Sequence, residues 1–155
     1  MSSCIFCKII RGELPCTKVY EDESVAAFLD IKPVNPGHTL VIPKKHFENI
    51  HDMPDALVAK VAVAAKKIAD AMRNIGVKGV NIGMNNGAHA GQIVFHAHMH
   101  VMPRYGKDSF SLWVGKEYYG KERELVAEKI KHRQECIFDP AYFLRKETLT
   151  LHSAP

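Results

Sequence analysis

Long apolar runs, dense basic tracts and internal repeats are all missing from this sequence. No apolar stretch approaches the length of a transmembrane helix, and the N-terminus lacks the pattern of a signal peptide, so we expect a cytoplasmic protein with no membrane partner. No run of Lys and Arg is interleaved with aromatic residues, so no nucleic-acid partner is expected either. The formal net charge of +4 is modest and suits a small anionic ligand such as a nucleotide.

Cysteine is scarce, with four in 155 residues, and only Cys4 and Cys7 are close in sequence. In a reducing compartment disulfides are not expected, which leaves a metal or a redox role for this Cys-x-x-Cys pair. A redox pair of this spacing usually lies between a strand and a helix, whereas no strand precedes this one. The position favours metal binding, with two buried thiols as the alternative.

The rest of the composition is that of an ordinary globular domain, with 46% hydrophobic and 25% charged residues. Apolar patterns and turn residues predict strands at 19–20, 25–29, 39–43, 80–84 and 94–103, and helices at 7–11, 55–75 and 121–132. Hairpin strands with one long helix indicate an antiparallel α+β fold. We place one domain at residues 1–132 and a C-terminal tail at 133–155, where no periodicity is strong.

The long helix is predicted by apolar residues that recur at spacings of three and four. They are Leu57, Val61, Ala64, Ala65, Ile68, Met72 and Ile75. Such a stripe lies along one helix face and indicates packing against the core. Gly76 is expected to end the helix.

The strand expected at 94–103 carries His96, His98 and His100 at every second position. Successive side chains of a strand point to opposite faces, so the three imidazoles share one face. The other, core-facing side would carry Phe95, Ala97, Met99 and Val101. Aligned imidazoles are costly to bury without partners, which indicates a metal site or nucleophilic and acid–base chemistry. Ligands roughly 7 Å apart along a straight strand are too far apart for one ion with bonds of ~2 Å, so a metal held by all three is rejected.

A loop of small and amide residues precedes the histidines, from Asn85 to Gln92. Gly87 and Gly91 let backbone N–H groups approach a ligand closely, and the side chains of Asn85 and Gln92 add donors. Asn-Asn-Gly is also a common turn. Beside three aligned histidines, however, the loop predicts a phosphate cradle.

Together these stretches resemble the histidine triad (HIT) family of nucleotide-binding proteins, in its Hint-like and Fhit-like members, whose signature is three histidines that alternate with apolar residues. The similar segments span about residues 4–104 in the family's order. They are Cys4-Ile5-Phe6-Cys7-Lys8-Ile9-Ile10, Phe28-Leu29-Asp30-Ile31, Gly37-His38-Thr39-Leu40-Val41-Ile42-Pro43-Lys44-Lys45-His46, and Gly91-Gln92 with His96-Ala97-His98-Met99-His100-Val101-Met102. The resemblance implies an antiparallel sheet with one long helix and a C-terminal helix, and a homodimer across which the sheet continues.

The resemblance also implies catalytic roles for four histidines. His98 matches the family's nucleophile, whose ring nitrogen attacks the α-phosphorus of a nucleotide derivative and forms a nucleotidyl-histidine that water hydrolyses. His100 would contact the phosphate, and His38 would complete and orient the cluster. His96 is the remaining member of the triad.

Nucleotide contacts follow from the same resemblance. Asn85, Gly91 and Gln92 would hold the α-phosphate oxygens and stabilise charge in the transition state. Asp30 would bond the ribose hydroxyls. The apolar slot around a purine would be lined by Ile5, Phe6, Ile9 and Leu14.

Family members with an N-terminal Cys-x-x-Cys, a zinc-containing branch of prokaryotic type, hold zinc with two cysteines and two histidines. The matching positions are Cys4, Cys7, His46 and His96. Four protein ligands complete a tetrahedron, so the resemblance implies a structural zinc.

The chain departs from the family pattern at Ile93, where Hint-type members have Ser and Fhit-type members have Thr, so a hydroxyl donor to the phosphate is missing. Pro103-Arg104 after the triad is closer to the Fhit-type sequence. We therefore expect a hydrolase of purine nucleoside 5′-phosphoramidates or related nucleotide derivatives. The alternative reactions are dinucleoside polyphosphate hydrolysis and nucleotidyl transfer. The non-enzymatic alternative is a zinc-stabilised nucleotide-binding or scaffold protein.

Overall fold

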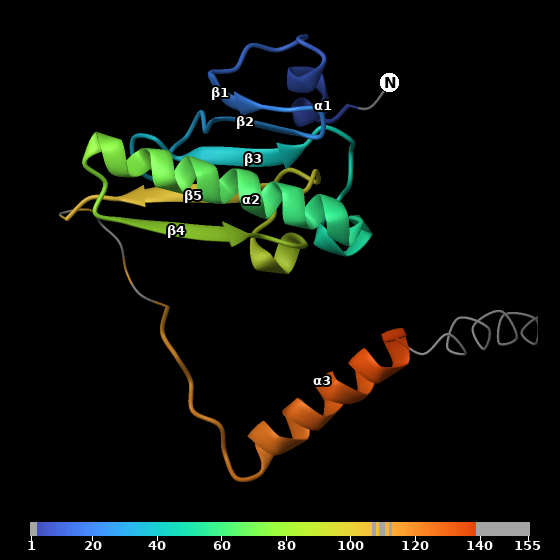
Figure 1. The fold of residues 1–155 in the computed structure, drawn as a ribbon. Coiled ribbons are helices and arrows are strands. Elements are labelled where there is room, and N and C mark those ends of the chain that lie inside the picture. The colour runs from blue at the N-terminus through green and yellow to red at the C-terminus, as the bar shows by residue number, and fades with distance from the viewer. Residues whose placement is uncertain (1–2, 107, 109–110, 112, 139–155) are drawn as a thin grey trace, which may run out of the picture. The chain divides into compact units, whose positions relative to one another are not determined.

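The structure is a computed structural model that describes residues 3–106, 108, 111 and 113–138, so the expected tail beyond residue 138 lies outside the described residues. The chain divides into two units, Met1–Phe110 and Ser111–Pro155. The first unit contains the sheet and the second contains helix α3 (Glu122–Phe138), as Figure 1 shows. None of the described helices is long and apolar enough to cross a membrane.

Five antiparallel strands form one sheet in the order β1-β2-β3-β5-β4, which together with the helices confirms the expected α+β fold. The strands are β1 (Lys18–Glu21), β2 (Val25–Leu29), β3 (Thr39–Pro43), β4 (Gly79–Met84) and β5 (Met99–Arg104). The central pairing of β3 with β5 is short and runs from Thr39 opposite Val101 to Val41 opposite Met99.

Helix α2 (Asp55–Met72) lies across one face of the sheet and covers the larger part of the core (Figure 1). The predicted apolar stripe is confirmed, with buried residues at Val61, Ala64, Ala65, Ile68 and Met72. Ile75 is the exception and is 60% exposed, because the helix gives way after Met72 to a 3₁₀ turn that breaks the spacing. Gly76 then ends the turn with a φ of 80°.

The short helix α1 (Ile5–Ile10) covers the opposite face of the sheet, where a smaller apolar cluster lies. Its buried members are Phe6, Ala26, Phe28, Leu40 and Ile42. The helix begins at Ile5, two positions before the expected turn at 7–11, because Cys4 is extended and occupies the cap. The rings of His96 and His98 contact Phe6, so both histidines face this side of the sheet.

The strand expected at 94–103 is wrong in its first half, since β5 begins at Met99. The backbone N–H of Ala97 donates instead to the carbonyl of Phe47 at 2.7 Å. Ala97 and Val101 are buried in the core beneath α2 as expected, whereas Phe95 is 44% exposed and does not belong to it. The alternation of side chains thus begins before the strand itself does.

In the second unit, α3 continues to Phe138, past the expected helix end at residue 132. Residues 133–138 contain no Gly or Pro to stop a helix, so the first part of the expected tail is helical.

Candidate functional site

The histidines that are regularly spaced in the sequence divide into two groups in the structure. His38, His98 and His100 lie together, with ring centroids 4.8 Å apart for His98 and His100 and 5.1 Å apart for His38 and His100. His96 turns its Nδ1 toward the cysteines of the N-terminal segment. The structure therefore brings together three of the four predicted catalytic histidines and gives the fourth other neighbours.

His98 is the histidine whose reactive nitrogen is best defined. It is 6% exposed, and its Nδ1–H donates to the backbone carbonyl of His96 at 2.7 Å. With its proton on Nδ1, a neutral imidazole keeps a lone pair on Nε2. Burial lowers the pKa of His98 below its usual value, although the His96 carbonyl and the charge of Asp30 act in the opposite direction. Nε2 is thus available as a neutral nucleophile near pH 7.

His38 and His100 form a hydrogen-bonded pair, and a backbone N–H determines which ring nitrogen of His38 carries the proton. The N–H of Val34 donates to Nδ1 of His38 at 3.3 Å, which assigns the proton of a neutral His38 to Nε2. That Nε2–H donates to Nδ1 of His100 at 3.0 Å. His100 consequently carries its own proton on Nε2, where it can donate to a bound anion.

Burial is the main cause that lowers the pKa of both His38 and His100. The pKa of His100 falls to about 4, because burial and the neighbouring rings of His98 and His38 all oppose its protonation. The cluster is therefore uncharged near pH 7, and its imidazoles act as donors and acceptors with fixed directions.

Asp30 follows β2 and lies beside this cluster. Its Oδ2 is 3.5 Å from Nδ1 of His38, and its Oδ1 accepts a hydrogen bond from the N–H of Lys32 at 2.8 Å. The backbone N–H of Asp30 donates to the carbonyl of His38 at 2.9 Å, which fixes the distance between the two residues. Asp30 is the one predicted ribose contact, and it lies within reach of the histidines.

The predicted phosphate loop follows β4 and is shaped by two glycines with positive φ. Gly87 has a φ of 86° and Gly91 a φ of 82°, a region that other residues rarely adopt. Asn85 donates to the carbonyl of Gly91 at 3.3 Å and closes the loop. A Cβ on Gly91 would lie 3.5 Å from the side-chain nitrogen of Asn85, so the loop is closely packed at this point.

Gln92 is 4% exposed and all of its side-chain hydrogen bonds in the structure are internal. Its Nε2 donates to the carbonyls of Glu48 at 2.6 Å and Val94 at 3.1 Å, and its Oε1 accepts from the N–H of Gly87 at 2.7 Å. Both amide hydrogens are therefore committed to backbone carbonyls. In this arrangement Gln92 braces the loop rather than offering a donor to a phosphate.

The four apolar residues expected around a purine do not share one environment. Ile5 is 48% exposed and Leu14 36%, while Ile9 is half-buried. Phe6 is only 6% exposed, and its ring lies edge-on to the rings of His96, His98 and Phe28. Ile5, Ile9 and Leu14 can offer apolar surface to a base, whereas Phe6 supports the histidines from below.

A second cluster joins the two cysteines of the N-terminal segment to two histidines. One possible ligand atom from each of Cys4, Cys7, His46 and His96 lies within 4.8 Å of the others. The Nδ1 of His46 is 3.2 Å from that of His96 and 3.3 Å from Sγ of Cys7, and the His96 Nδ1 is 3.5 Å from Sγ of Cys4.

These residues fit a zinc ion. Zinc bonds of about 2.0–2.3 Å in a tetrahedron place neighbouring ligand atoms roughly 3.3–3.8 Å apart, close to the separations in this cluster. The Nε2–H of His96 donates to the carbonyl of Pro43 at 2.9 Å, which leaves Nδ1 unprotonated and directed at the cluster. Burial also lowers the pKa of His96 to about 4, so the ring is neutral, as a metal ligand must be.

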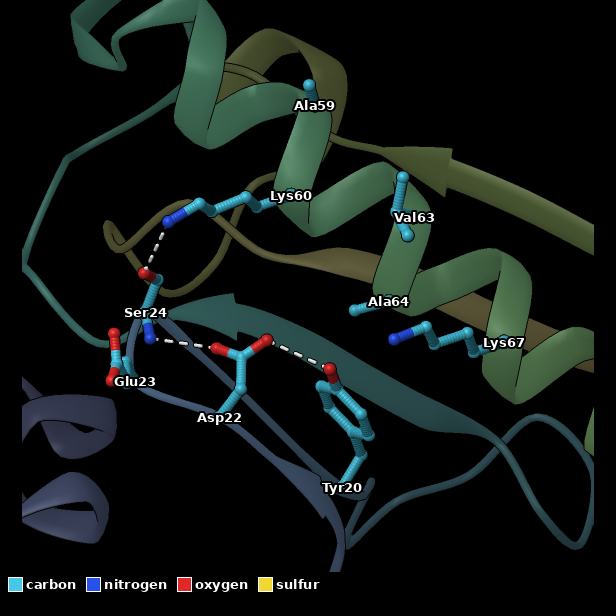
Figure 2. Close-up of a pocket in the computed structure, with 9 residues that line it drawn as sticks. All are labelled: Tyr20, Asp22, Glu23, Ser24, Ala59, Lys60, Val63, Ala64 and Lys67. Carbon is cyan, nitrogen blue, oxygen red and sulfur yellow. Dashed lines mark hydrogen bonds between the residues drawn. The ribbon is translucent and has the colours of Figure 1, made fainter.

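A groove of about 420 Å³ lies elsewhere in the first unit, between the β1–β2 turn and α2 (Figure 2). Figure 2 shows the Asp22 carboxylate bonded to the N–H of Ser24 and the hydroxyl of Tyr20, and Lys60 bonded to the Ser24 hydroxyl. The lining contains no histidine or cysteine and belongs to the α2 face of the sheet. Four of its polar residues bond to one another, and the groove has no histidine in its lining, so the chemistry of the histidines takes place elsewhere.

Several groups that define the site are backbone atoms, which the sequence could not reveal. The carbonyls of His96 and Pro43 and the N–H of Val34 decide which nitrogen of each histidine carries a proton. For Phe6, the sequence signal is its place between Cys4 and Cys7. The predicted zinc site brings these two cysteines to His96, and so brings Phe6 close to the histidines.

Comparison with known proteins agrees with this geometry. The family model described as the HIT domain matches residues 11–107. The protein named Protein hit from Bacillus subtilis is 55% identical over 117 residues, which are 72% of this chain and 79% of that protein. A Schizosaccharomyces pombe protein named adenosine 5′-monophosphoramidase hnt1 is 42% identical over 113 residues, covering 73% of this chain and 82% of that protein.

Solved structures are similar over most of the chain. A crystal structure of a HIT family member from Bacillus subtilis has 47% identity and a TM-score of 0.79, and covers 85% of this chain and 97% of that one. A zinc-bound histidine triad family protein from Mycobacterium smegmatis has 39% identity and a TM-score of 0.68, and covers 86% and 97%.

Proposed function

This chain belongs to the HIT domain family, and we propose that it is a nucleotide hydrolase whose nucleophile is Nε2 of His98. The observation that carries the proposal is the 2.7 Å hydrogen bond from Nδ1 of His98 to the carbonyl of His96. It keeps a lone pair on Nε2 of a buried, neutral imidazole, which is what attack on phosphorus requires.

The reaction has two steps. Nε2 of His98 bonds to the α-phosphorus of a nucleoside 5′-phosphoramidate, and the bond to the amine breaks with its electron pair on nitrogen, which takes a proton from solvent. Water then attacks phosphorus in the nucleotidyl-histidine, releases the nucleoside monophosphate and restores the lone pair of Nε2. Splitting one displacement into two lets imidazole, a better nucleophile than water, expel the amine, and it gives water a good leaving group to displace in the second step.

His100 would hold the phosphate during both steps, and His38 would orient it. The chain of hydrogen bonds from Val34 through His38 places the proton of His100 on Nε2, so that this N–H can donate to a phosphate oxygen. A donor fixed before the reaction needs no reorientation as charge develops. Because burial lowers the pKa of both histidines, the pair is neutral and would bind an anionic substrate through hydrogen bonds and not as an ion pair.

The substrate class proposed is a purine nucleoside 5′-phosphoramidate or a related derivative. Asp30 would accept hydrogen bonds from the ribose hydroxyls, and Asn85 would donate the second hydrogen of its amide to the α-phosphate. The N–H of Gly91 donates to the carbonyl of Ala88 at 2.9 Å, so Gly91 would shape the loop around the phosphate. Gln92 acts on these contacts by bracing the loop. Support for a phosphoramidate comes from the S. pombe relative named for that activity. Dinucleoside polyphosphate hydrolysis is the second candidate, favoured by Pro103-Arg104 after the triad.

We also propose that Cys4, Cys7, His46 and His96 hold a structural zinc. The separations within the cluster and the zinc-bound relative from M. smegmatis support it. Zinc with four protein ligands has no open position for a substrate, so it would join the N-terminal segment to the sheet and take no part in the reaction.

The proposed function is tested by His98→Asn, with His132→Asn as a control on an exposed histidine of α3. Turnover of adenosine 5′-phosphoramidate and of diadenosine polyphosphate would be measured beside the affinity for AMP. Loss of turnover in His98→Asn with AMP binding retained, and an unchanged His132→Asn, supports the assignment. Turnover that survives in His98→Asn contradicts it.

A further inference from the structure

The metal cluster and the nucleophile share one residue. His96 directs its imidazole Nδ1 at the cysteines, while its backbone carbonyl accepts the hydrogen bond from His98. A shift of the His96 backbone would therefore move the acceptor that sets both the tautomer and the ring direction of His98. The two sites are linked through a single peptide unit.

Phe6 makes a second link. It lies between Cys4 and Cys7 in the sequence, and its ring centroid is 5.8 Å from that of His96 and 5.3 Å from that of His98. The ring contacts both histidines edge-on, and at 6% exposure it cannot move without disturbing the core beneath them. Ligation of the two cysteines would fix the position of this ring.

The segment from His96 to His98 depends on such anchors because it precedes the strand. The β3–β5 ladder reaches only from Val101 back to Met99. The segment is held by the Ala97 N–H bond to Phe47, the His96 N–H bond to Val94, and the side chain of His96 on Pro43. A metal held by the cluster would add a restraint on the end that carries the acceptor for His98.

We propose that the Cys4–Cys7–His46–His96 cluster, when it holds its metal, positions the nucleophile His98 through the backbone of His96 and the ring of Phe6. Phe6 is a positioning residue and touches no reacting atom. The inference deepens the proposed function and rests on it for its kinetic readout. It predicts that the metal acts on the rate of the chemical step without taking part in that step.

Binding and chemistry should respond differently to the loss of this restraint. The polar nucleotide contacts proposed, Asp30 after β2 and the loop after β4, lie outside the metal cluster, whereas Ile5 and Ile9 lie on α1 and keep their place while the metal is bound. Replacing Phe6 with the metal still bound should therefore leave the affinity for AMP nearly unchanged, whereas a nucleophile displaced by a fraction of an ångström loses rate on the order of ten- to a hundredfold.

The test compares Phe6→Leu with Phe28→Leu. Both rings are buried in the same cluster and contact one another, but of the two Phe6 has the contacts with His96 and His98. Each variant, purified with its zinc and with zinc content measured, would be assayed for kcat, for AMP affinity and for unfolding temperature. The ring ¹⁵N resonances of His98, assigned with His98→Asn, report the tautomer independently of activity.

The expected result is a fall in kcat of roughly tenfold or more in Phe6→Leu, with AMP affinity unchanged and a His98 resonance that no longer reports a single Nδ1–H tautomer. Phe28→Leu should lose comparable thermal stability and keep both kcat and the tautomer. Equal effects of the two variants on kcat and on the His98 resonance would overturn the inference.

Metal removal gives a second, independent comparison. Cys4→Ser removes one zinc ligand, and Cys16→Ser removes an exposed cysteine outside the cluster. At a temperature where both remain folded, Cys4→Ser should show the kinetic and ¹⁵N changes of Phe6→Leu, and Cys16→Ser neither. Zinc-free protein with an unaltered kcat and His98 resonance would overturn the inference. A wild type that holds zinc and a single His98 tautomer but turns over no nucleotide would instead refute the proposed function.

Discussion

At the scale of single residues, backbone atoms decide what each histidine can do. Carbonyl acceptors hold Nδ1–H of His98 and Nε2–H of His96, while an N–H donor meets Nδ1 of His38. Three chemically identical side chains thereby become a candidate nucleophile, a candidate metal ligand and a donor to the next imidazole. A motif states which residues are present, and these hydrogen bonds assign their roles.

Acid should destabilise the protein through His100, which faces His98, His38 and Asp30. Burial lowers its pKa from 6.5 to about 4 in the folded state, so the unfolded chain binds a proton at a higher pH than the folded one. The free energy of unfolding is thus expected to fall as the pH drops from about 6.5 toward 4. Urea unfolding of wild type and His100→Asn across this range measures it. The variant should show the shallower loss, and parallel curves would contradict the explanation.

The variant Gln92→Ala distinguishes a structural role of Gln92 in the loop from direct contact of its side chain with the phosphate. Removing the amide leaves the carbonyls of Glu48 and Val94 and the N–H of Gly87 without these partners, which costs about 1–3 kcal/mol for a buried group. A lower unfolding temperature without nucleotide is therefore expected, with weaker AMP binding as a consequence. If AMP binding weakens while stability of the nucleotide-free protein is unchanged, Gln92 contacts the phosphate directly.

At the scale of elements, prediction from sequence is most accurate where an apolar run is bounded by polar residues on both sides. The strands at Val25–Leu29 and Thr39–Pro43 were predicted to the residue, because each apolar run follows a turn and stops at a charged residue, Asp30 or Lys44. The start of β5 was missed, because the alternation of histidines with apolar residues extends beyond the hydrogen-bonded ladder. Residue pattern records which way side chains face, and it does not record which backbone groups pair.

The candidate site was predicted less completely than the fold. Histidine spacing and family resemblance identified the residues, but burial of Phe6 and the internal bonds of Gln92 depend on contacts between distant segments. Glu48 and Gln92 are far apart in sequence, and no local pattern in either segment predicts their contact.

Bound zinc would hold helix α1 at both ends of its first turn, through the proposed ligands Cys4 and Cys7. A helix of six residues is too short to be stable alone, so loss of the metal should release it from the sheet. Cys4→Ser with Cys7→Ser is expected to lower zinc content to near zero and to lower the unfolding temperature by several degrees. The corresponding loss in the free energy of unfolding is on the order of 2–4 kcal/mol. Elemental analysis and thermal unfolding check both. Wild-type protein purified without chelator yet free of metal would contradict the zinc assignment.

At the scale of the whole molecule, the two edges of the sheet differ. β1 is four residues long, carries Lys18 and Glu21, and has an irregular register with β2. Charges and bulges of this kind discourage pairing with another sheet. β4 has six residues, none charged, and lies next to the strand that carries His100. We therefore propose that β4 pairs with β4 of a second copy and extends the sheet.

Ile82→Lys tests this dimer. Ile82 lies in the middle of β4 and is 49% exposed in the single chain, so a charge there should convert a dimer to a monomer. Val19→Lys is the matched control on the opposite edge, with 48% exposure, and should leave the assembly unchanged. Sedimentation velocity reports both. A dimer that survives Ile82→Lys and dissociates with Val19→Lys would assign the interface to the other edge.

Intact-protein mass spectrometry after rapid quenching without acid tests the central claim, covalent catalysis by His98, most directly. Wild type and His98→Ala would be mixed with adenosine 5′-phosphoramidate and followed in time beside product formation. We predict that wild type gains the mass of one adenylyl group as product appears and that His98→Ala gains none. Product formed by wild type with no adduct at any time, or an equal adduct on His98→Ala, would contradict the account.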